Sequence, residues 1–77
     1  MAKTIFLVDD SATILLSVSS ILGKAGYAVE KSASAEEALQ KFSAGIKVDL
    51  LITDLNMPGM NGIELIKKVR SLTAYRF

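Results

Sequence analysis

Short apolar runs alternate with stretches of helical periodicity along this chain. Residues 5–8 (IFLV) form a continuous apolar run, which is typical of a central strand buried on both faces of a parallel sheet. The shorter apolar run at residues 50–52 (LLI) is typical of a buried strand. Residues 27–31 predict a weaker strand whose one strong apolar position is Val29, and this polar character is typical of a sheet edge. The pattern therefore predicts three strands, of which the second lies at an edge.

Each predicted strand is followed by a predicted helix. The first helix begins at a cap formed by Asp10 or Ser11 and ends near Gly26. Its apolar stripe consists of Ile14, Leu15, Val18, Ile21 and Leu22. The second helix is opened by Ser34 and Glu37, which are spaced as a capping box. Its apolar face consists of Ala38, Leu39 and Phe42.

The third helix is predicted over residues 62–72. Asn61 is its predicted cap, with Glu64 three residues later. The aligned apolar positions are Ile63, Ile66 and Val69. Residues 73–77 show no clear period. The order β-α-β-α-β-α predicts an α/β fold with a parallel sheet and right-handed crossovers, within a single domain of 77 residues.

Composition narrows the possible chemistry. Nine Lys and Arg residues nearly balance eight Asp and Glu residues, so no charge field predicts a nucleic-acid or membrane partner. The sequence has no Cys and no His, which removes thiolate ligands, disulfides and the usual general base. Hydrophobic residues make up 51% of the chain, which indicates either a dense core or an apolar surface that meets a partner. The N-terminus does not resemble a signal peptide, and we expect a cytoplasmic protein.

Acidic residues follow the first and third predicted strands. Asp9 and Asp10 end the first, and Asp54 ends the third, just before the loop Asn56-Met57-Pro58-Gly59. Pro58 and Gly59 are typical of a turn, and we interpret Met57, Pro58, Gly59 and Gly62 as residues that shape this loop. Two structural alternatives remain open: Asp9 and Asp10 are favoured helix caps, and Asp54 is favoured at the start of a turn.

Two segments carry a family resemblance. The sequence LVDDS after the first strand, and LLITDLNMPGMNGIEL over residues 50–65, resemble the receiver domain of a bacterial two-component response regulator of the chemotaxis type. The resemblance implies a flavodoxin-like parallel sheet in the order 2-1-3, which places the first and third strands side by side. That order would bring Asp9, Asp10 and Asp54 together.

The resemblance also implies a chemistry. Asp54 would accept a phosphoryl group from a sensor histidine kinase or a small phosphodonor, and this self-directed transfer would be the only catalysis. Three converging carboxylates repel one another, so either they bind a cation or one of them is protonated. All-oxygen ligands favour Mg²⁺ as that cation. Asp10 would bind Mg²⁺ directly and Asp9 mostly through water. Asp54 and the backbone carbonyl of Asn56 would complete the magnesium ligands.

The chain departs from the family pattern in extent. Receiver domains have five βα units, and residues 1–77 supply three, so the resemblance implies a partial receiver domain that lacks the fourth and fifth units. The Ser or Thr after the fourth strand and the Lys after the fifth have no counterpart here, and we expect impaired phosphorylation. The third strand would be an exposed edge. The alternative function is thus a non-signalling scaffold that forms homo-oligomers through that strand.

Two enzyme or cofactor classes fit less well. Phosphatases with an aspartyl nucleophile usually place a second Asp two residues later, where this chain has Asn56. A flavin-binding flavodoxin needs a phosphate site at the first β–α turn, and Asp9 and Asp10 make that turn acidic.

Overall fold

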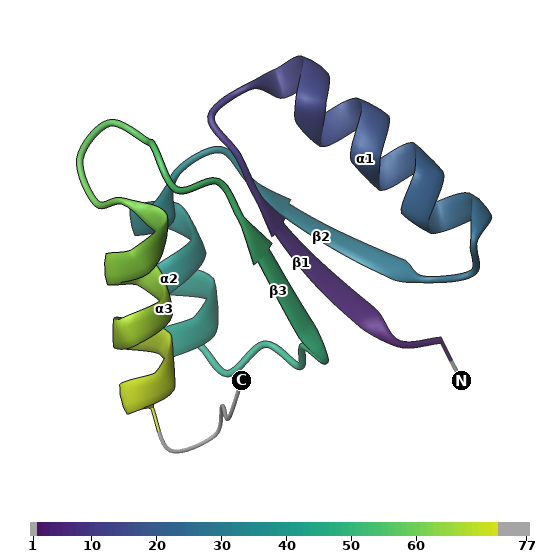
Figure 1. Ribbon diagram of the computed structural model, residues 1–77. Helices are drawn as coiled ribbons and strands as arrows, with labels where there is room; N and C mark the ends of the chain where they lie inside the picture. The colour runs from purple at the N-terminus through teal and green to yellow at the C-terminus, as the bar shows by residue number, and fades with distance from the viewer. Residues whose placement is uncertain (1, 73–77) are drawn as a thin grey trace.

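In a computed structural model, which describes residues 2–72, the chain forms a three-stranded parallel sheet with helices on both faces (Figure 1). The strands are β1 (Thr4–Val8), β2 (Ala28–Ser32) and β3 (Leu50–Thr53). The helices are α1 (Ala12–Lys24), α2 (Ala35–Ser43) and α3 (Gly62–Ser71). The order β2-β1-β3 confirms the predicted flavodoxin-like arrangement. Residues 73–77, for which no period was recognised, lie outside the described part.

The register of the sheet aligns the carboxyl ends of its strands. Val8 at the end of β1 is paired with Ser32 of β2 on one side and with Thr53 of β3 on the other. The next residues continue these contacts: the Asp9 N–H donates to the Ser32 carbonyl at 3.2 Å, and the Asp54 N–H donates to the Val8 carbonyl at 2.9 Å. Backbone pairing therefore places Asp9 and Asp54 at one edge of the sheet.

The main core lies between the sheet and the pair α2 and α3. Phe6 and Val8 of β1 are fully buried against Phe42, Leu65 and Val69 from the two helices. The Phe6 and Phe42 rings are in contact, with centroids 4.9 Å apart. This core fixes α2, α3 and the central strand relative to one another.

The opposite face of the sheet is covered by α1 (Figure 1). Side chains alternate along a strand, so Ile5 and Leu7 point to this face, and both are buried. The predicted stripe of α1 is buried only in part. Leu15 is buried, whereas Ile14 and Ile21 are 47% and 66% exposed.

The predicted apolar face of α3 is confirmed at Val69 and wrong at Ile63. Leu65 and Val69 are buried, Ile66 is half-buried and Ile63 is exposed. Positions 62, 65 and 69 also fit a helical period, and the core selects that stripe because the Leu65 side chain faces Phe6 and Phe42 in the core cluster. Within residues 2–72, no helix is both long and apolar enough to cross a membrane.

The helix caps agree largely with the sequence. Ser11, rather than Asp10, caps α1, and its Oγ accepts from the Ile14 N–H at 3.3 Å. Asn61 and Glu64 form a complete capping box at α3. At α2 the Ser34 Oγ accepts from the Glu37 N–H at 3.1 Å, but the Glu37 carboxylate lies 3.6 Å from Lys41 Nζ. Of the capping box predicted at α2, only the hydrogen bond to Ser34 is therefore formed.

Candidate functional site

Asp9 is the first residue after β1 and is half-buried. Its Oδ1 accepts a hydrogen bond from the Ser11 N–H at 2.9 Å, which fixes the turn into α1. Asp9 therefore has a structural role, which uses one of its two carboxylate oxygens. Asp10 is exposed and does not cap α1, because Ser11 holds that position. The capping alternative is therefore wrong for both acids: Asp9 forms the turn before the helix, and Ser11 is the cap.

Asp54 is the first residue after β3 and is also half-buried. Its backbone N–H is bound to the Val8 carbonyl, and its backbone carbonyl accepts from the Thr53 hydroxyl at 2.9 Å. The side-chain Oδ1 lies 3.4 Å from the Asn56 N–H, which is a long contact of the turn-forming type. Asn56 is exposed beside Asp54, and the proposed metal contact of its carbonyl stays a prediction.

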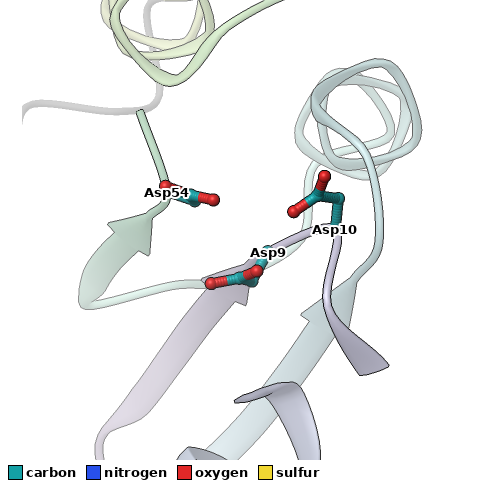
Figure 2. Close-up of side chains that lie close together, drawn as sticks. All are labelled: Asp9, Asp10 and Asp54. Carbon is teal, nitrogen blue, oxygen red and sulfur yellow. The ribbon is translucent and has the colours of Figure 1, made fainter. Parts of the chain in front are cut away.

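The structure brings the three acids together. Asp9, Asp10 and Asp54 each offer a carboxylate oxygen, and these oxygens lie within 4.8 Å of one another. Figure 2 shows the Asp10 and Asp54 carboxylates turned toward each other, with Asp9 at the end of β1 between them. Residues separated by more than forty positions in the sequence thus form one acidic cluster at the carboxyl edge of the sheet.

The donor set fits a hard divalent cation. Three anionic oxygens this close repel one another unless a positive charge lies among them. Oxygen atoms alone, without nitrogen or sulfur, favour Mg²⁺ or Ca²⁺ over softer metals. Two oxygens bound directly to one Mg²⁺ lie at most about 4.2 Å apart, so a separation of up to 4.8 Å leaves room for a contact through water. Asp9, which is already bonded to Ser11, is suited to such a contact.

The loop between β3 and α3 is shaped by two glycines. Gly59 has a φ of +76°, in the left-handed region that side chains disfavour. Gly62 has ordinary backbone angles, but a Cβ there would overlap the Asp54 backbone carbonyl oxygen. The Gly62 N–H also donates to the Leu55 carbonyl at 3.2 Å. Gly62 therefore lets α3 begin directly against the residue that carries the third acid.

Met57 corrects our interpretation of this loop. It is 8% exposed and belongs to the core cluster beneath α2 and α3, so its role is packing rather than shaping the turn alone. The local sequence contains one signal for this: a large apolar side chain within an otherwise polar and glycine-rich loop. Met57 anchors the segment that follows Asp54 to the core.

Comparison with known proteins agrees with this site. The family model for the response regulator receiver domain matches residues 5–75. This chain belongs to the response regulator receiver family. It is a receiver domain of two-component signalling, and the edge where Asp9, Asp10 and Asp54 meet lies within the matched region.

The relatives of this chain include several chemotaxis proteins. The receiver is 40% identical to CheY1 of Helicobacter pylori over 73 residues, which cover 94% of this chain and 59% of the relative. It is 37% identical to CheY of Thermotoga maritima over 73 residues, which cover 94% of this chain and 60% of that relative. The structure of CheY4 of Vibrio cholerae matches with a TM-score of 0.93 at 42% identity, over 100% of this chain and 63% of that one. The receiver spans about three fifths of the length of these relatives.

Proposed function

We propose that this receiver accepts a phosphoryl group on Asp54, with Mg²⁺ held by Asp9, Asp10 and Asp54 and by the Asn56 backbone carbonyl. The observation that carries the proposal is the convergence of the three carboxylates within 4.8 Å. Membership of the receiver family supports a role in two-component signalling. The phosphodonor in this proposal is a sensor histidine kinase or a small acyl phosphate.

The transfer that we propose is a displacement at phosphorus. An Asp54 carboxylate oxygen forms the new P–O bond. The bond from phosphorus to the donor atom, a histidine nitrogen or an acyl-phosphate oxygen, breaks and its electron pair stays with the donor. Such transfers depend mainly on positioning and on neutralising the charge of the phosphoryl oxygens, which is what a bound Mg²⁺ supplies. The Asp54 N–H bond to Val8 and the Gly62 N–H bond to Leu55 hold the backbone around the acceptor in place.

The test is the intact mass of the protein after incubation with Mg²⁺ and acetyl phosphate. We expect a gain of one phosphoryl group, and no gain for Asp54→Asn, which keeps the size of the side chain and removes the nucleophilic carboxylate. Circular dichroism of both proteins shows that each is folded. A folded wild-type protein that gains no mass under these conditions would contradict the proposal.

A second candidate function is self-association through β3. This strand is an edge within the described residues, and its Leu50 and Ile52 side chains are 48% and 38% exposed. Exposed apolar edge strands pair readily with other chains. Sedimentation velocity over a range of concentrations tests this scaffold function. A monomer at all concentrations would exclude it, whereas an oligomer without phosphorylation would favour it over signalling.

A further inference from the structure

A carboxylate from α2 reaches across to the loop that carries the phosphorylation site. Glu36 lies in the first turn of α2, and its Oε2 accepts a hydrogen bond from the Met60 N–H at 2.8 Å. The two residues are 24 positions apart, so this contact joins two separate segments of the fold. Glu36 is exposed, and neither the capping of α2 by Ser34 nor the Glu37–Lys41 pair involves its side chain.

The loop backbone is built to admit this carboxylate. A Cβ at position 59 would lie 2.6 Å from Glu36 Oε2, so any residue other than glycine would push the carboxylate away. The positive φ of Gly59 turns the chain so that the next N–H, that of Met60, faces α2. Gly59 therefore serves the contact twice, through its backbone angle and through its lack of a side chain.

The charge state agrees with this geometry. The hydrogen bond from the Met60 N–H lowers the pKa of Glu36, and the Glu36 N–H lowers it further, while partial desolvation opposes both. The carboxylate is thus ionised near neutral pH. Hydrogen bonds to an ionised acceptor are stronger than those between neutral groups.

The loop has few other fixed points between Asp54 and α3. Met57 is packed in the core, and the Gly62 N–H bond to Leu55 closes the end of the loop. Met60 lies between these two anchors; its side chain packs against the core cluster, and its backbone N–H is held from outside the loop by Glu36. The backbone of Asn56, which we propose as a metal ligand, lies at the start of the same loop.

We propose that Glu36 is a positioning residue for the metal site: by binding the Met60 N–H, it fixes the loop that presents Asp54 and Asn56 to the cation. This inference rests on the proposed function, because it assumes that the acidic cluster binds Mg²⁺. Glu36 does not touch the cluster, so its effect passes through the loop backbone. Residues that orient metal ligands contribute measurably to affinity without contacting the metal.

The experiment is a Mg²⁺ titration of the ¹⁵N-labelled protein followed by NMR, with the wild type and three variants. Glu36→Ala removes the acceptor and the charge. Glu36→Gln removes the charge and keeps an acceptor oxygen. Glu37→Ala is the matched control, because it removes the same charge from the same turn of α2 and leaves the loop contact intact. The exchange rate of the Met60 amide is measured on the same samples.

We expect Glu36→Ala to weaken Mg²⁺ binding about three- to tenfold, somewhat less than the loss typical of a partner bonded directly to a ligand. Glu36→Gln and Glu37→Ala should each stay within about twofold of wild type, since an exposed charge is screened by solvent and salt. The Met60 amide should exchange faster in Glu36→Ala alone. Equal weakening by Glu36→Ala and Glu37→Ala would overturn the inference, because a distant charge would then explain it.

Two further outcomes separate this inference from the proposed function. A wild-type protein that binds Mg²⁺ but gains no phosphoryl group would overturn the proposed transfer, and the role of Glu36 would still be decided by the affinities of the variants. A wild-type protein without Mg²⁺-dependent shifts at Asp9, Asp10 or Asp54 would overturn the metal site and the positioning role together. Unchanged Mg²⁺ affinity in Glu36→Ala would overturn the positioning role alone.

Discussion

The two faces of the sheet differ in how completely they are covered. On one face α2 and α3 bury Phe6 and Val8 completely, and Leu51 of β3 packs against the same cluster. On the other face α1 covers Ile5 and Leu7, while Leu50 and Ile52 of β3 stay exposed. A single strand thus has one face in the core and one in solvent. The contrast indicates that stability is concentrated on the α2 and α3 face, which also supports the loop after Asp54.

The strongest test of this contrast compares Phe42→Ala with Ile21→Ala. Phe42 is 1% exposed and contacts Phe6, so its truncation should cost about 3–5 kcal/mol. Ile21 of α1 is 66% exposed, and its truncation should change the free energy of unfolding by less than about 0.5 kcal/mol. A domain of this size is stable by about 4–12 kcal/mol, so Phe42→Ala should lose a large share of its free energy of unfolding. Urea unfolding followed by circular dichroism measures the free energy of unfolding of both variants. Equal decreases in the two variants would refute the contrast between the two faces of the sheet.

An intermediate effect is expected from Gly62→Ala. The added methyl group overlaps the Asp54 carbonyl, so α3 or the end of β3 must move, at a cost of about 1–3 kcal/mol. The shift should also weaken Mg²⁺ binding, since Asp54 moves with its backbone. Gly23→Ala in α1 is the matched control, because nothing lies within 4 Å of its new Cβ. That change should be neutral or stabilise the domain by up to about 1 kcal/mol, through helix propensity. Thermal unfolding and the Mg²⁺ titration compare the two variants.

The smallest effect concerns pH. The pKa of Glu36 lies below its ordinary value of 4.5, so its hydrogen bond to Met60 contributes fully above that value. The extra strength of a hydrogen bond to an ionised acceptor is lost as the pH falls through the lowered pKa and the carboxyl group becomes protonated. The Met60 amide shift should therefore move in acid in the wild type and stay nearly constant in Glu36→Gln. Matching titration curves for the two proteins would show that Glu36 does not bind the loop in solution.

Much of the fold follows from local patterns in the sequence. The apolar runs at residues 5–8 and 50–52 both form strands, as predicted. Only β1 is central in the sheet; β3 is an edge of the described sheet, with Leu50 and Ile52 exposed. The polar strand near Val29 is found at an edge, as its composition predicts. Asn61 caps α3 because its side chain and that of Glu64 satisfy N–H groups that the helix leaves open. Strand order came from the family resemblance, since local patterns do not determine which strands are neighbours.

The remaining features depend on contacts between distant segments. The stripe of α3 could contain Ile63 or Leu65, and only the shape of the core beneath it selects Leu65. The need for glycine at position 62 arises from the Asp54 carbonyl, eight positions earlier in the chain. Nothing in the sequence around Glu36 predicts its hydrogen bond to the Met60 N–H, which lies 24 positions later. The three acids were identified from sequence, but how the loop beside them is held became visible only in three dimensions.

The pairing of β1 with β3 has a consequence for folding. The Thr4 N–H donates to Asp49 Oδ2 across 45 positions, and the Ile5–Leu50 pair spans a similar length of chain. Closing such a long loop is slow relative to local helix formation, so we expect β3 to dock after the helices form. Asp54 then approaches Asp9 and Asp10 against their mutual repulsion. A cation that binds only the assembled cluster would add about 2.7 kcal/mol at a hundred times its Kd. The ion concentration would therefore help to set how much of the chain completes its sheet.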